Sequence, residues 1–186
     1  MIPNDMNDGS PGAELSEMNG WNYDFSSLPL WTLRVRNPWC THKLIEDNEH
    51  DNACLLYGII EERMGDYRGY CAIFQNKSNP LCVATFPKIK VWLAQPTFSK
   101  DGRFVLLLAY NKDGKGVLFV LNIKNQTFAL VDLPISTSVL RIIETDINCF
   151  SLQAPEVEMR NNLIRKTCKK TIRIDKLSFE SWDVLQ

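Results

Sequence analysis

Residues 96–134 constrain the fold of this chain more than any other stretch. Two continuous apolar runs, residues 104–110 and 117–123, are followed by a third run at 127–133 that ends before Pro134. The runs are separated by sequences rich in Asp, Asn, Gly and Lys, including Asp101-Gly102 and Asp113-Gly114. Such sequences favour tight turns, and runs of this length bounded by turns are typical of strands. The stretch therefore predicts three consecutive antiparallel strands.

An earlier apolar run, residues 53–60, follows an acidic, turn-forming loop at 46–52. The spacing of its Leu and Ile residues is also close to helical, so a helix is an alternative. We predict a strand because of the repeat described next. Two other segments, residues 31–36 and 171–174, alternate apolar and polar residues, which is typical of half-buried strands.

The sequence contains a possible internal repeat. Residues 70–93 can be laid on residues 117–140 with a constant shift of 47 and without a gap, and a third copy can start near residue 148 with a shift of 51. The chain then reads as three units of about 45 residues, a period found in solenoids and propellers. Chance similarity between short strands would give the same pattern, and the sequence leaves both explanations open.

The segment 96–134 resembles a β-propeller blade of the kind with an S-x-D-G turn, here residues 99–102, before its first strand. The three units are fewer than the four to eight blades of a closed propeller. We therefore expect an all-β fold: an antiparallel meander of about three repeated three-stranded units, forming a curved sheet, a sandwich or a partly open barrel or propeller-like body. Residues 1–20, rich in Asn, Asp, Gly and Ser, predict a flexible N-terminal arm, and residues 21–186 a single all-β domain.

Composition places the chain among ordinary globular proteins, with 45% hydrophobic and 23% charged residues among 186. It has no apolar run long enough to span a bilayer and no basic segment followed by an apolar one at its start, so we expect a cytoplasmic protein. The six cysteines form no C-x-x-C pair. Free thiols in a reducing compartment are therefore a better interpretation than a disulfide framework.

The sequence contains few groups that would support catalysis. His50 lies among carboxylates, but the spacing matches neither a zinc site nor a calcium loop, so we interpret the segment as a solvated loop. Cys40 and His42 are too close in sequence for a thiol–imidazole pair to align readily, and the phosphate-binding and nucleophile-elbow motifs are missing. We expect neither catalytic residues nor a metal or cofactor, although a carboxylate pair would leave no signature and remains an alternative.

Charge is distributed unevenly along the chain. Residues 1–66 contain 12 acidic and 4 basic residues, whereas residues 67–186 contain 10 and 17, although the formal net charge is only −1. Residues 160–176 hold seven Lys and Arg residues, but aromatic residues that could stack on bases are not interleaved with them. An edge strand protected by lysines explains this segment better than a nucleic-acid site.

Acidic residues between 46 and 66, flanked by aromatic residues, form the most suggestive surface feature. A solubilising face is the simpler interpretation. The alternative is a patch that mimics phosphate groups and binds a basic protein, with charge accelerating the encounter and aromatic residues providing affinity. The predicted partner-binding residues are Glu46, Asp47, Glu49, Asp51, Glu61, Glu62, Asp66, Trp39, Tyr67 and Tyr70.

In overall type, a small β-domain with an acidic patch and without a catalytic motif resembles the immunity proteins of bacterial contact-dependent inhibition systems. The resemblance implies a non-catalytic protein that occludes the active site of a toxin, often a basic nuclease. We therefore expect a protein partner, rather than a membrane, a nucleic acid or a small molecule. A propeller-like adaptor that completes its sheet with another chain is the first alternative, and a carboxylate-dependent enzyme is the second.

Overall fold

Strands dominate the computed structural model of this protein, which describes residues 19–31, 44–63, 66–92, 94–133, 141–158 and 164–186. Short 3₁₀ turns occur at Phe25–Ser27, Ile174–Lys176 and Trp182–Leu185. The strands are β1 (Leu44–Asp47), β2 (Asn52–Arg63), β3 (Asp66–Gln75), β4 (Leu81–Thr85), β5 (Lys90–Trp92), β6 (Thr97–Phe98), β7 (Phe104–Tyr110), β8 (Gly116–Asn122), β9 (Thr127–Asp132), β10 (Arg141–Asp146), β11 (Cys149–Glu158), β12 (Ile164–Arg173) and β13 (Glu180–Ser181). In the described part of the chain, no helix is long and apolar enough to cross a membrane.

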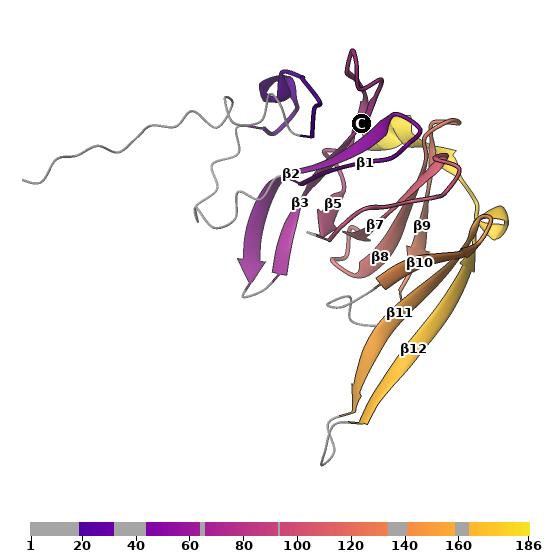
Figure 1. The fold of residues 1–186 in the computed structure, drawn as a ribbon. Coiled ribbons are helices and arrows are strands. Elements are labelled where there is room, and N and C mark those ends of the chain that lie inside the picture. The colour runs from indigo at the N-terminus through magenta and orange to yellow at the C-terminus, as the bar shows by residue number, and fades with distance from the viewer. Residues whose placement is uncertain (1–18, 32–43, 64–65, 93, 134–140, 159–163) are drawn as a thin grey trace, which may run out of the picture.

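The strands form a ten-stranded sheet and a three-stranded sheet, both antiparallel (Figure 1). The larger sheet has the order β1-β2-β3-β5-β7-β8-β9-β13, with β4 paired to β3 and β6 paired to β7. The smaller sheet has the order β10-β11-β12. The all-β, antiparallel architecture and the curved sheet predicted from the sequence are confirmed.

The larger sheet divides into two halves that are joined through β5. This short strand pairs with the start of β3, at Arg68 and Gly69, and with the end of β7, at Ala109 and Tyr110. The later part of β3 pairs with β4. The first part of β7 pairs with β6. The first half, β1–β4, and the second half, β6–β9 with β13, can therefore face each other.

Burial explains why the run that forms β7 is apolar at every position. In β7, Val105 and Leu107 belong to a core shared with Cys54 and Ile73 of the first half. The intervening residues of β7, such as Leu106, pack instead against the smaller sheet. Because β7 is covered on both faces, all seven of its residues are buried. The two halves and the smaller sheet thus form successive layers.

The two outermost faces of this stack of layers differ in what covers them. The outer face of the first half is covered by the segment 19–31, whose Trp21, Phe25 and Leu28 pack on Leu55 and Phe74. On the smaller sheet, Phe150 and Leu152 face the second half. The residues alternating with them in the sheet include the polar Gln153, Thr171 and Arg173. The described outer face of the smaller sheet is therefore mostly polar, with Ile143 as an exposed apolar residue on it.

The local predictions agree closely with the strands. The runs 104–110, 117–123 and 127–133 form β7, β8 and β9, and the run 53–60 lies within β2, so the helical alternative is wrong. The hairpins β3–β4 and β8–β9 occupy the positions that the shift of 47 superimposes. The third unit differs, because β13 pairs with β9 instead of β12. The predicted strand at 31–36 lies almost entirely outside the described residues.

Cysteines in the described part of the chain are free thiols, as predicted. These are Cys54, Cys71, Cys82 and Cys149, whereas Cys40 and Cys168 lie outside the described positions. Burial raises the pKa of the Cys71 thiol, and a hydrogen bond with Cys54 raises it further. Burial also raises the pKa of Cys82 to about 11. The Cys71 and Cys82 thiols therefore stay protonated near neutral pH and serve as packing groups.

Candidate functional site: a cleft between strand edges

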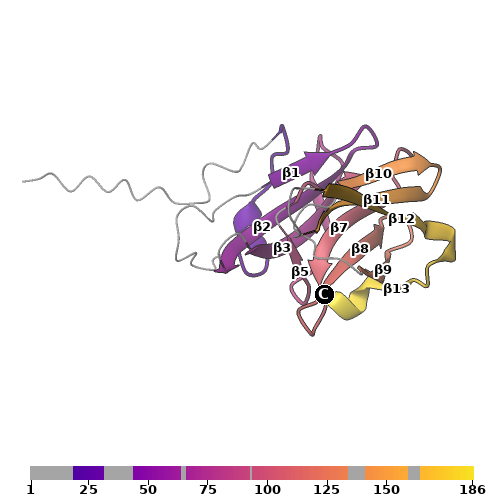
Figure 2. The ribbon, with the colours of Figure 1, turned by 90° about the horizontal axis from the view of Figure 1, so that it is seen from below.

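A cleft of about 620 Å³ lies where the three layers of the stack approach one another. Its walls come from β1, from the segment around β6, from β7 and from β10. Figure 2 shows β1 and β10 along the same side of the molecule. The lining residues are Glu46, Asp47, Ala94, Gln95, Pro96, Thr97, Phe98, Leu108, Arg141, Ile142 and Ile143.

The cleft runs along strand edges and does not cover the face of a sheet. Consecutive residues of a strand point to opposite faces, yet Ile142 and Ile143 both line the cleft, as do Glu46 and Asp47. A cleft that is lined by two consecutive residues of a strand must lie beside the backbone of that strand, at its edge. In the described part of the chain the strand pairings are β1 with β2, β6 with β7 and β10 with β11. One backbone group of β1 has a further partner, since Asn19 Nδ2 donates to the Ile45 carbonyl oxygen at 3.0 Å. Three strands therefore turn an edge toward the cleft.

The turn at residues 99–103 connects the edges of β1 and β10. The His50 imidazole, just after β1, donates from Nε2 to the Lys100 carbonyl oxygen at 2.8 Å, which requires the proton on Nε2. The backbone N–H of Lys100 donates to the Glu144 carboxylate in β10 at 2.7 Å. These two contacts hold the β1–β2 loop and β10 against the same short turn, and so fix the width of the cleft at this end.

The sequence explains why this turn is rigid. The Ser99 hydroxyl donates to the Asp101 carboxylate at 2.7 Å and accepts from the Phe104 N–H at 2.9 Å. The Gly102 N–H donates to the Ser99 carbonyl at 2.9 Å. Burial alone would raise the pKa of Asp101, but hydrogen bonds from Ser99 and Arg103 outweigh it and hold the pKa below the usual value. The S-x-D-G sequence is thus a preorganised support for the cleft.

Four predicted acidic residues are brought together around the β1–β2 loop, but two of them have structural partners. Asp47 accepts a hydrogen bond from Lys77 Nζ at 2.6 Å and another from Trp21 Nε1 at 3.1 Å. Asp51 accepts from the Lys77 backbone N–H at 2.7 Å. The Lys77 contact holds the pKa of Asp47 below its usual value, despite partial burial. Asp47 and Asp51 therefore attach this loop to the β3–β4 turn.

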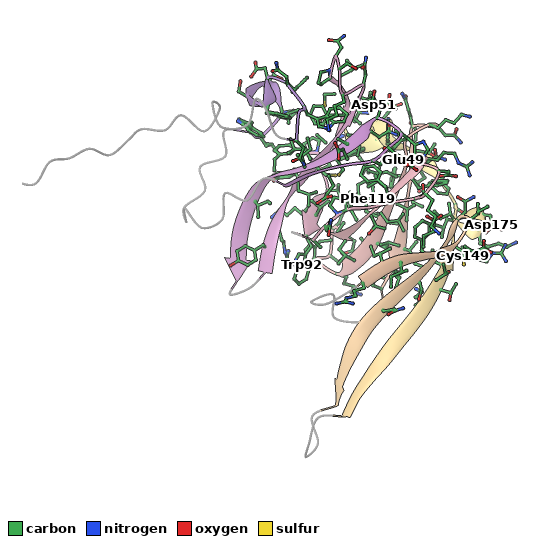
Figure 3. All side chains as sticks on the ribbon, viewed as in Figure 1. Glu49, Asp51, Trp92, Phe119, Cys149 and Asp175 are labelled. Atoms are coloured by element: carbon green, nitrogen blue, oxygen red, sulfur yellow. The ribbon has the colours of Figure 1, made fainter. Side chains whose placement is uncertain are left out.

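The other two carboxylates remain available to a ligand. Glu46 borders the cleft and is partly buried, and its side chain makes no hydrogen bond or ion pair within the described residues. The Glu49 side chain is 84% exposed, with His50 Nε2 3.8 Å away. In Figure 3, Glu49 and Asp51 lie at the end of the molecule formed by the β1–β2 loop. Glu46 and Glu49 are thus the acidic groups best placed to meet a partner.

The remaining predicted site residues lie elsewhere. Glu61, Glu62 and Asp66 are at the far end of the β2–β3 hairpin. The rise from Asn52 to Glu61 along β2 is roughly 30 Å, and the side chains at 61, 62 and 66 are outside the described set. Tyr67 packs against the core between the two halves, whereas Tyr70 packs on the opposite face. Trp39 is outside the described residues, so the structure joins only part of the predicted patch.

Reasoning from acidic clusters missed the apolar and basic walls of the cleft, which include Phe98, Ile143 and Arg141. These residues belong to β6 and β10, which are distant in sequence from β1. Neither the charge pattern nor the apolar periodicity records how these segments pack together.

Metal binding and acid–base chemistry have little support in the described residues. They contain no group of three His, Cys, Asp or Glu residues that could hold a metal ion. A carboxylate pair acting as general acid and base needs one member with a raised pKa. In the cleft, the pKa of Asp47 is lowered by its contact with Lys77. The arrangement is better suited to binding through backbone edges and fixed charges.

Comparison of the chain with protein-family models, with curated proteins and with solved structures finds no match.

Proposed function

We propose that this chain is a non-catalytic binding protein whose cleft receives an extended segment of a protein partner. The observation that carries the proposal is the convergence of three strand edges, from β1, β6 and β10, on one cleft. Wherever backbone N–H and C=O groups of a strand edge are unpaired, that edge can pair with an added strand. The apolar walls, including Pro96, Phe98 and Ile143, offer contacts for alternate side chains of that strand.

The charged residues of the cleft indicate what kind of partner segment would bind there. Glu46 stands on the β1 side of the cleft and Arg141 on the β10 side, while Glu49 is exposed in the β1–β2 loop that follows β1. A partner strand with a cation opposite Glu46 and a carboxylate or carbonyl opposite Arg141 would satisfy both groups. Glu49 would add attraction for a basic partner during the encounter. A basic protein domain that inserts one extended segment fits this pattern.

An immunity protein is the functional class that this proposal favours. A nuclease toxin has a basic surface that holds the phosphates of its substrate. The carboxylates of Glu46 and Glu49 would lie where those phosphates bind, and the protein would inhibit the toxin by covering its active site. Binding would need no bond to be made or broken on this chain, which agrees with the edge-and-charge character of the cleft.

A propeller-like adaptor is the second candidate, supported by the four-stranded meander β6-β7-β8-β9 and by the stacking of successive units. An adaptor of this kind could complete its stack with another copy or another chain. The mostly polar outer face of the smaller sheet does not favour a further layer there. Light scattering after gel filtration separates the two candidates, because the adaptor is expected to self-associate and the inhibitor to be a monomer when alone.

The decisive test uses a photo-crosslinking residue in place of Ile143, which is 43% exposed on the wall of the cleft. The captured protein is then produced separately and titrated calorimetrically against wild type, Glu46→Gln and the control Glu180→Gln. Glu180 is an exposed acid on β13, away from the cleft. We expect Glu46→Gln to weaken binding about 5- to 20-fold, the loss of a charged hydrogen bond, and Glu180→Gln to change it less than about twofold.

Two results would refute the proposal. One is a partner that binds Glu46→Gln and wild type with equal affinity, and the other is a captured protein that saturates at no defined stoichiometry. If the partner is an enzyme, an immunity function also predicts that an equimolar amount of this chain abolishes its activity. Binding that leaves the activity of the partner unchanged would favour the adaptor.

A further inference from the structure

A second hollow, of about 260 Å³, lies away from the cleft and differs from it in charge. It is formed where β3, β5 and the β7–β8 turn meet. Among the described residues, seven line it, of which four are cationic and none is acidic. The lining residues are Arg68, Lys88, Lys90, Tyr110, Asn111, Lys112 and Gly114.

The sheet register explains how these cations converge. Arg68 lies opposite Trp92 in the β3–β5 pair, and Lys90 lies opposite Tyr110 in the β5–β7 pair. Residues 90 and 92 of β5 share a face, so all four side chains stand on the same face of three neighbouring strands. That face continues directly into the turn that carries Lys112, which brings charges from distant parts of the sequence together.

An aromatic stack holds one of the cations in place. The rings of Trp92 and Tyr110 are stacked with centroids 5.8 Å apart, and the Arg68 guanidinium lies 3.7 Å from the Tyr110 centroid. A guanidinium fixed over an aromatic face loses little freedom when an anion binds. Because Tyr110 is buried, its ring is not accessible to a base or sugar. The stack favours recognition of an anion over recognition of an aromatic ligand.

The β7–β8 turn supplies the rest of the site. The Asn111 side-chain oxygen accepts from the backbone N–H groups of Asp113 and Lys115, at 3.0 and 2.9 Å, and so fixes the turn. Within the described residues, Asn111 Nδ2 has no hydrogen-bond partner and is left as a donor. Lys88 also lines the hollow, and its Nζ donates to the Val184 carbonyl oxygen at 3.3 Å.

We propose that this hollow binds the phosphate group of a small phosphorylated ligand. Its volume is below the roughly 300–1,000 Å³ of pockets that enclose whole ligands, so it suits a charged group more than an entire molecule. A phosphate carries two negative charges near neutral pH and several acceptor oxygens, which match lysine, arginine and amide donors. The site is independent of the cleft, and its test needs no protein partner.

The experiment is a nuclear magnetic resonance titration of the full chain, labelled with ¹⁵N, at low salt. The probes are pyrophosphate, adenosine monophosphate and adenosine. We expect the first two to shift the amide resonances of Lys112 and Gly114 to saturation, and adenosine to leave them unchanged. Lys112→Gln should weaken the binding of both phosphates about 5- to 10-fold, as expected for one charged contact.

Lys115→Gln is the matched control, because Lys115 is on the same exposed turn and carries the same charge but does not line the hollow. It should weaken binding less than about twofold, the effect of a screened neighbouring charge. Equal losses in the two variants would mean a diffuse attraction of anions and would overturn the proposal. Shifts that do not saturate, or equal responses to adenosine and adenosine monophosphate, would also overturn it.

Discussion

The contact between Gly102 and His50 makes a sharp prediction, because the chain contains a matched control. Gly102 has a φ of 67°, and a Cβ added there would lie 2.5 Å from the Cγ and 2.6 Å from the Cβ of His50. Gly114 has a φ of 74°, and a Cβ there would meet no atom within 4 Å. Both Gly→Ala variants are strained by the left-handed backbone, but only Gly102→Ala collides with a neighbour.

The size of the difference follows from these contacts. The left-handed conformation costs an alanine about 1 kcal/mol, and this is the whole effect expected for Gly114→Ala. In Gly102→Ala the imidazole must also move, since His50 Cβ is attached to the backbone and cannot rotate away. The hydrogen bond from Nε2 to Lys100 is then lost, which adds about 1 kcal/mol, and displaced packing adds a similar amount. We expect a total near 3 kcal/mol.

Urea unfolding followed by tryptophan fluorescence measures the effect as a change in midpoint at constant slope. Gly102→Ala should be about 2 kcal/mol less stable than Gly114→Ala. In a double-mutant cycle, His50→Gly should remove most of the extra cost of Gly102→Ala, because it removes the atoms that collide. If both alanine variants lose the same free energy, or if the cycle shows no coupling, the described fit of His50 on Gly102 is wrong.

Two further predictions concern the contact of Asp47 with Lys77 and the packing of Phe119 in the core. The Lys77 contact lowers the pKa of Asp47 from its ordinary 3.8, so Asp47 contributes stability above that value and loses it as the pH falls through its lowered pKa. Asp47→Asn should therefore lower the free energy of unfolding by about 0.5–1 kcal/mol at pH 7 and by progressively less below pH 4. Urea titrations at several pH values measure this difference. A difference that grows toward low pH would contradict the prediction. Phe119 is fully buried against Phe86 and Phe128, with ring centroids 5.4 and 5.9 Å away, so Phe119→Ala should cost about 3–5 kcal/mol in the same assay. Leu130→Ala, at an exposed position of the partner strand, should cost less than about 1 kcal/mol, and equal losses would place Phe119 outside the core.

Local sequence patterns predicted the strands well because strand and turn signals are local. The runs at 104–110 and 117–123 are bounded by Asp-Gly turns, and each forms the expected strand. Pairing between distant strands depends on packing that periodicity does not record. The short strands β5 and β6, and the pairing of β13 with β9, therefore had no signal in a scan for apolar runs.

Only part of the candidate site could be predicted from the sequence, because the rest depends on contacts between distant segments. Charge identified Glu46 and Glu49, which are close in sequence and remain available in the fold. It could not separate them from Asp47 and Asp51, whose partner Lys77 comes from a distant turn. Nor could it show that Arg141 faces the same cleft as Glu46, since that depends on how the units stack.

The position of both proposed sites follows from how the core is built. Every residue of β7 and nearly every residue of β8 is buried, since each strand is covered on both faces. Strands of this kind leave few side chains for a ligand, and β7 contributes Leu108 to the cleft and Tyr110 to the hollow. Recognition must then use what stacking leaves exposed, which is the edges of the outermost strands and the turns at the ends. The cleft uses the edges of β1, β6 and β10, and the cationic hollow uses the β7–β8 turn. A substitution that changes binding without changing stability should therefore fall on these edges and turns, whereas substitutions in β7 or β8 should affect both together.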